Sequence, residues 1–145
     1  VIPFDQLFFG GGANSVRGWR QRTLGPGSTF DSNNNVDKLG EVKLECNAEY
    51  RFPITSVFKG ALFIDAGNVW THEADYDADN YDPNFAFNRF YKEIAVSPGL
   101  GIRLDFDFFL FRVDLGVPIK QPYHRTTWKL DPQKTQLNFG VGYPF

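Results

Sequence analysis

Residues 41–52 read EVKLECNAEYRF and alternate between apolar and polar side chains without interruption. The apolar positions are Val42, Leu44, Cys46, Ala48, Tyr50 and Phe52. A period of two over this length predicts a β-strand, and one longer than the ~5–6 residues usual in soluble proteins. It matches the ~9–11 residues that a tilted strand needs to cross a bilayer. The stretch therefore predicts a sheet with one apolar face and one charged face.

Four more segments carry strand patterns. They are residues 58–70, 94–104, 109–119 and 135–145. In the second of these, small residues such as Ser97, Gly99 and Gly101 share one face with Arg103, which leaves room for an inserted object. The sequence predicts an all-β fold built as an antiparallel meander of about five strands.

The connections between these segments alternate in length. Residues 53–57 and 105–108 are short, whereas residues 71–93 and 120–134 are long. Short turns at one end and long loops at the other are typical of outer-membrane β-barrels. Aromatic residues near the strand ends, Trp70 and Phe106 among them, are interpreted as interfacial belts.

Composition excludes several classes of protein. The 145 residues have a net charge of -2, which gives no basic footprint for nucleic acid. One cysteine, Cys46, excludes an internal disulfide and a multi-cysteine metal site, and we expect it to pack or to contact lipid.

Five strands cannot close a membrane barrel, because the smallest have ~8. The chain is therefore expected to be part of a larger sheet or to self-associate with other copies.

Residues 8–27, FFGGGANSVRGWRQRTLGPG, are too rich in glycine for a regular element. Glycines at both ends supply turn geometry, and Arg17 lies between them beside Gly18 and Trp19. This pattern predicts a structured loop that carries function.

Two motifs resemble those of a known family. The Val-Arg-Gly-Trp core of the loop is similar to the sixth-loop signature of the bacterial surface antigen family, the BamA/TamA-type outer-membrane assembly barrels. ALFIDAGNVW, residues 61–70, is similar to the second signature of that family, F-x-D-x-G-x-x-W. Its fixed positions are filled by Phe63, Asp65, Gly67 and Trp70.

The resemblance implies the C-terminal part of a sixteen-stranded transmembrane β-barrel. Residues 1–39 would be an extracellular loop folded into the barrel, and residues 40–145 would supply five strands. It also implies that Arg17 pairs with Asp65 and contacts Glu49. Gly18, Trp19 and Gly67 complete the expected loop-anchoring set.

The C-terminus resembles the assembly signal of outer-membrane proteins. Gly140, Tyr143 and Phe145 fit that signal, whereas Phe139 and Pro144 depart from it. In the family a weakly paired last strand forms a lateral gate, and Pro144 would weaken such pairing. An ordinary frayed terminus explains the same residues.

The function implied is assembly, insertion or translocation of outer-membrane proteins. Expected partners are outer-membrane lipid, nascent outer-membrane proteins, and periplasmic or lipoprotein factors bound through N-terminal domains outside this chain. No catalytic constellation is present, so we expect neither enzyme activity nor a cofactor nor a metal. Asp75, Asp77 and Asp79 lack the glycine and glutamate of a calcium loop, and His72 and His124 are isolated. The alternative is a soluble, secreted all-β binding module.

Overall fold

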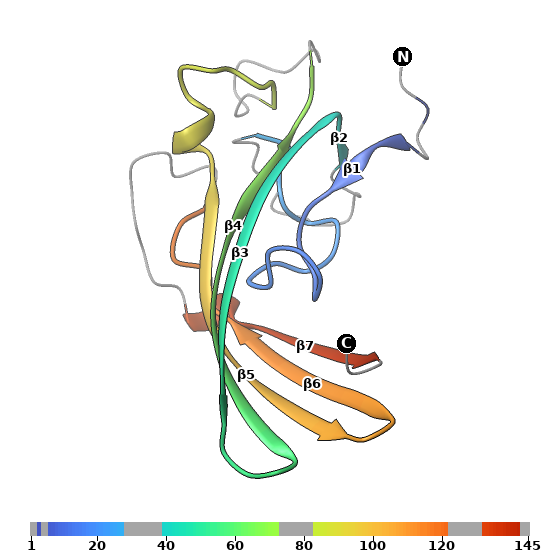
Figure 1. Ribbon diagram of the computed structural model, residues 1–145. Helices are drawn as coiled ribbons and strands as arrows, with labels where there is room; N and C mark the ends of the chain where they lie inside the picture. Colours follow the sequence, from blue (N-terminus) through green and yellow to red (C-terminus); the bar gives the residue numbers. More distant parts are fainter. Residues whose placement is uncertain (1–2, 4–5, 28–38, 73–82, 122–131, 143–145) are drawn as a thin grey trace.

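The computed structural model of the chain describes residues 3, 6–27, 39–72, 83–121 and 132–142. Within these ranges five consecutive strands pair antiparallel, in chain order, into one curved sheet (Figure 1). The strands are β3 (Val42–Pro53), β4 (Phe58–Trp70), β5 (Ala95–Phe106), β6 (Phe109–Gly116) and β7 (Gln136–Gly142). The all-β antiparallel meander predicted from the alternation is confirmed.

The remaining elements within the described residues are short. They are the paired strands β1 (Phe8–Phe9) and β2 (Leu39–Gly40), and the 3-10 turns η2 (Phe90–Lys92) and η3 (Pro132–Lys134). In the part of the chain that the structure describes, no helix has the length and apolar character to cross a membrane.

The strand boundaries follow the periodicity closely. β4 has the predicted bounds, and β3 and β5 differ by one or two residues at an end. β6 stops at Gly116 instead of Ile119, because the next residue, Val117, lies opposite Pro98 of β5, which has no N–H to complete the pair. The chain still follows β5 beyond that point, since the N–H of Val117 donates to the carbonyl of Pro98 at 2.9 Å.

The two faces of the sheet have opposite character. The convex face presents apolar side chains that are exposed in the described part of the chain. On the four strands from β4 to β7 they include Leu62, Ile64, Leu100, Ile102, Leu115, Leu137, Phe139 and Val141, each at least 43% exposed. Asp65, Arg103 and Asp114 are instead fully buried on the concave face. Buried charge with exposed apolar surface is the reverse of a water-soluble sandwich and fits a strand wall that faces lipid.

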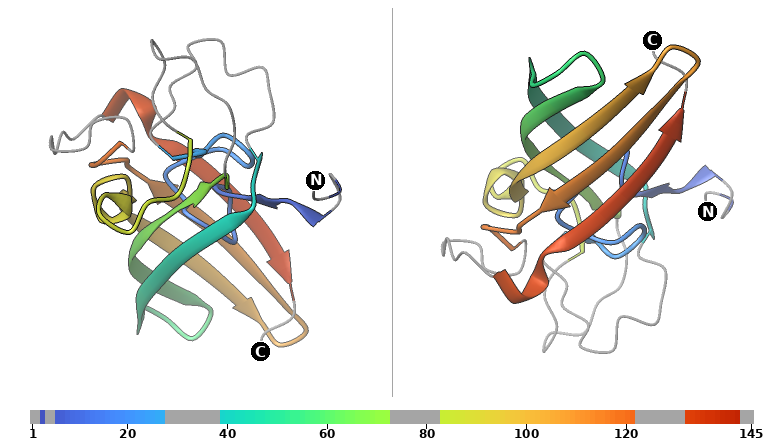
Figure 2. Two further views of the ribbon diagram at one scale, coloured as in Figure 1. Left: turned by 90° about the horizontal axis from the view of Figure 1, so that it is seen from above. Right: turned by 90° about the horizontal axis from the view of Figure 1, so that it is seen from below.

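A loop fills the concave side (Figures 1 and 2). We call residues 10–24 the inserted loop, because Gly10 and Leu24 close its base with an antiparallel bridge. Its apolar residues Val16, Trp19 and Leu24 form a buried cluster with Ala95 of β5. The small residues predicted on the inner face of β5 therefore do accommodate an inserted object.

The aromatic-belt interpretation is wrong for Trp70. Its ring is fully buried, with edge-on contacts to Phe85 and Phe90 at centroid distances of 5.4 and 6.5 Å. The indole N–H donates to the Glu93 carboxylate at 2.8 Å. The segment after β4 folds back over this strand end, and alternation within β4 could not reveal that cover.

Candidate functional site

The inserted loop is compact and folds back on itself, with Arg17 at its middle. Gly11 and Gly12 have φ values of 90° and 96°, which side chains other than glycine rarely adopt. The N–H of Gly12 donates to the carbonyl of Trp19 at 2.8 Å. The N–H of Trp19 donates to the carbonyl of Val16 at 3.2 Å. These bonds fold the segment back on itself and direct Arg17 toward the sheet.

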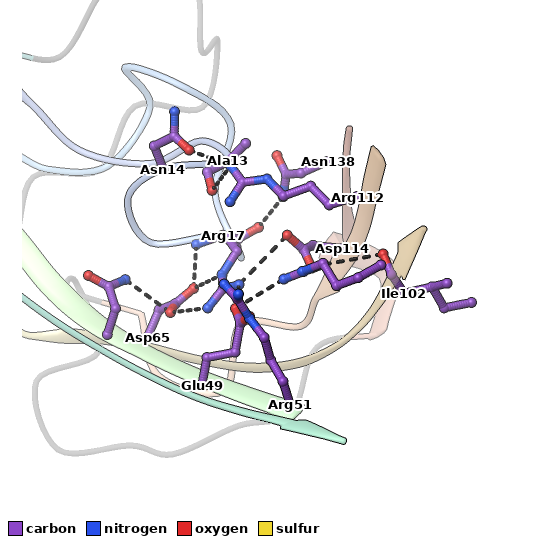
Figure 3. A network of polar contacts seen from close by, with 12 residues as sticks. Ala13, Asn14, Arg17, Glu49, Arg51, Asp65, Ile102, Arg112, Asp114 and Asn138 are labelled. Atoms are coloured by element: carbon purple, nitrogen blue, oxygen red, sulfur yellow. Dashed lines mark hydrogen bonds and ion pairs between the residues drawn. The ribbon is translucent and has the colours of Figure 1, made fainter. Parts of the chain in front are cut away.

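Arg17 makes a two-pronged contact with Asp65 of β4 (Figure 3). Its Nε and Nη2 donate to the two carboxylate oxygens at 2.7 and 2.8 Å. The backbone N–H of Arg17 adds a third bond to the same carboxylate at 3.0 Å. Planar guanidinium and carboxylate groups match in this geometry, so the contact fixes both position and orientation.

Two more carboxylates surround the same guanidinium. Nη1 of Arg17 lies 2.7 Å from Glu49 of β3 and 3.6 Å from Asp114 of β6. Arg103 of β5 bridges these two acids, at 2.5 Å to Asp114 and 3.0 Å to Glu49. Three acids and three arginines, with Arg51 on Glu49 at 2.5 Å as the third, leave the cluster formally neutral. One loop residue thus meets side chains from three strands.

The surroundings of Arg17 keep it charged. Burial acts to lower the pKa of Arg17, but its hydrogen bonds to Asp65 and Glu49, together with the negative charges of Asp65 and Asp114, outweigh burial and raise the pKa above its ordinary value. Its guanidinium carbon also lies 3.5 Å from the centroid of the Phe63 ring, in cation–π geometry. Phe63 itself is 5% exposed, so the contact is shielded from water.

Gly18, Trp19 and Gly67 lie around this contact. A Cβ on Gly18 would come within 2.2 Å of the Ser97 hydroxyl, so only glycine lets the loop approach β5 this closely. The Trp19 side chain packs with Val16 and Leu24 in the buried apolar cluster. A Cβ on Gly67 would lie 2.6 Å from the carbonyl oxygen of Leu44.

Sequence reasoning missed several polar partners of the loop. Asn47 donates to Asp65 at 3.0 Å and to the carbonyl of Ser15 at 2.9 Å. The Ser15 hydroxyl donates to Glu45 at 2.6 Å. Arg103 and Asp114 were also not predicted as site residues. Their position on the inward face beside glycines was the available signal, since an isolated charge there needs a partner.

The C-terminal signal lies only partly within the described residues. Gly140 is on the inner face of β7, directly opposite Arg112 of β6. Tyr143 and Phe145 lie outside the described residues, as do Asp75, Asp77, Asp79 and His124. Among the residues that are described, no group of acidic, histidine or cysteine side chains is placed to hold a metal ion.

Comparison with known proteins agrees with this architecture. The family model of the Omp85 superfamily domain matches residues 2–145. The chain belongs to the Omp85 superfamily. It is 36% identical over 88 residues to the outer membrane protein assembly factor BamA of Neisseria meningitidis serogroup B, a match that covers 57% of this chain. That match covers 10% of the relative, so the chain spans about a tenth of its length.

Membership in this superfamily confirms the resemblance that the two motifs suggested. It places the chain in the bacterial outer membrane and not among soluble, secreted binding modules. The exposed apolar convex face fits that location, because lipid would cover it.

Proposed function

We propose that this chain is the C-terminal part of a barrel that assembles, inserts or translocates outer-membrane proteins. In this proposal residues 1–39 form an extracellular loop that folds inward, and residues 40–145 supply the last five strands of a sixteen-stranded wall. The Omp85 match and the likeness to an assembly factor support the proposal. The observation that carries it is the enclosure of Arg17 by carboxylates from β3, β4 and β6.

The cluster suits a locating role better than a purely stabilising one. Burying a guanidinium and its acids costs several kcal/mol per ion, and pairing returns little beyond that cost. Removing one partner, however, leaves an unpaired buried charge, which costs about 3–5 kcal/mol. The arrangement therefore penalises every loop position except the one in which Arg17 meets Asp65 and Glu49.

In the proposed mechanism the chain acts through backbone pairing and shape, without enzyme chemistry or a cofactor. Arg17, Gly18 and Trp19 hold the loop inside the barrel wall. The loop in turn keeps the strands of the wall in the curvature that the strands of an incoming protein would encounter. The outer face contacts outer-membrane lipid, and the incoming strands come from nascent outer-membrane proteins. Periplasmic or lipoprotein factors would bind N-terminal domains that this chain does not contain, and the isolated chain can self-associate through its open sheet edges.

The test uses Arg17→Ala, Asp65→Ala and the double variant in the natural full-length protein. Each single variant should reduce the amount of folded outer-membrane protein in cells. The double variant should be little worse than either single, because the two residues act as one pair. Arg20→Ala is the matched control, since Arg20 is an exposed arginine of the same loop. Additive losses in the double variant would reject the pairing.

A further inference from the structure

A second set of contacts joins the inserted loop to β6 and β7, on the side of the sheet opposite β3 and β4. The Asn138 side chain of β7 donates to the backbone carbonyl of Arg17 at 2.9 Å. Arg112 of β6 donates through Nη2 to the carbonyl of Ala13 at 3.0 Å and also to the side chain of Asn14 (Figure 3). None of these bonds involves the carboxylates that hold the Arg17 side chain.

The backbone of β7 makes room for the longer of these side chains. Gly140 pairs directly with Arg112 across the two strands. A Cβ on Gly140 would meet Nε, Cγ and Cδ of Arg112 at 2.5, 3.0 and 3.2 Å, and these are its three nearest atoms. Arg112 therefore runs across the face of Gly140 on its way to the loop. Gly142, two residues further on the same strand, has nothing within 4 Å of its Cβ position.

The two sides of the sheet bind mainly different groups of the loop, and Asn47 of β3 also donates to the loop carbonyl of Ser15. β3 and β4 present acceptors, the carboxylates of Glu49 and Asp65, to the Arg17 side chain. β6 and β7 present donors, from Arg112 and Asn138, to carbonyl oxygens of the loop. Within the described sheet β7 pairs with β6 alone. The hydrogen bond from Asn138 therefore gives β7 a contact with the loop besides its pairing with β6.

We propose that Arg112 and Asn138 are positioning residues that attach strand β7 to the inserted loop, and that Gly140 leaves the space that the Arg112 side chain requires. Because the loop is also bound to β3 and β4, it would hold β7 at a fixed position relative to those two strands. The attachment depends only on these contacts, whereas its effect on membrane assembly rests on the proposed function.

Hydrogen–deuterium exchange on the natural full-length protein in micelles tests the attachment. Arg112→Ala and Asn138→Leu should each speed exchange of residues 136–142 and of the loop by about tenfold to a hundredfold, as expected for lost hydrogen bonds of this kind. Residues 58–64 of β4 should keep their exchange rates. Arg112→Lys retains a donor on a long stem and should recover part of the protection. Unchanged exchange at residues 136–142 in both Arg112→Ala and Asn138→Leu would overturn the proposal.

A double-variant cycle tests the clearance. Gly140→Ala should speed exchange of the loop and β7, and Gly142→Ala, the matched control, should not. With Arg112→Ala already present, Gly140→Ala should add nothing, because the atoms that it would strike are gone. An equal effect of Gly140→Ala in both backgrounds would reject the assignment of Arg112. Exchange is measured apart from assembly activity, so a barrel with another activity would still show these changes.

Discussion

Asp65→Asn is the sharpest probe of the charge cluster, because it changes charge with almost no change in shape. Asp65 accepts four hydrogen bonds, from the backbone N–H, Nε and Nη2 of Arg17 and from Asn47. Two of these bonds reach each carboxylate oxygen. An asparagine has one acceptor oxygen, so in either orientation its amide N–H groups face two donors.

The expected loss follows from that geometry. Arg17 is 4% exposed and Asp65 is fully buried, so water cannot replace the lost acceptor without opening the loop. Breaking a buried pair in this way costs about 3–5 kcal/mol, which corresponds to about two to three and a half orders of magnitude in the opening equilibrium. We expect amide exchange of residues 10–24 in the full-length protein to accelerate by that factor.

Asp105→Asn supplies the matched control. Asp105 forms a similar pair at 2.7 Å with Lys59, whose side chain is 41% exposed. A pair of this kind contributes about 1 kcal/mol or less, so loop exchange should change little. Loop exchange in Asp65→Asn no faster than in Asp105→Asn would show that the Arg17 contact does not hold the loop.

Two further substitutions test close packing and lipid contact. Gly18→Ala should loosen the loop by about 1–3 kcal/mol through its clash with Ser97, and Ser97→Gly should restore the loss, as measured by the same exchange. Cys46 is exposed on the convex face, which lipid would cover. A charged maleimide should therefore label Cys46 at least about tenfold more slowly in liposomes than in denaturant. Cys46→Ala, which lacks the thiol, is the blank. Failure of the Ser97→Gly rescue, or equal labelling rates, would contradict these assignments.

The sequence by itself determined the strands and their faces. Strict alternation in residues 41–52 placed Glu49 on the polar side, and the pattern of residues 58–70 did the same for Asp65. A period of two assigns each residue to one face of a sheet, whatever the rest of the chain does. The two motifs added the resemblance from which the pairing of Arg17 with Asp65 was expected.

Only the tertiary structure decided which side chains meet across the sheet. Asp114 lies 97 positions after Arg17 in the chain, yet their charged groups are 3.6 Å apart. Register between strands and the depth of the loop set that distance, and alternation contains neither quantity. The same reason explains Trp70, which later residues cover, and Gly140, whose neighbour Arg112 is on another strand. The local pattern determines the face of the sheet on which a residue lies, and long-range strand pairing determines which side chains contact it.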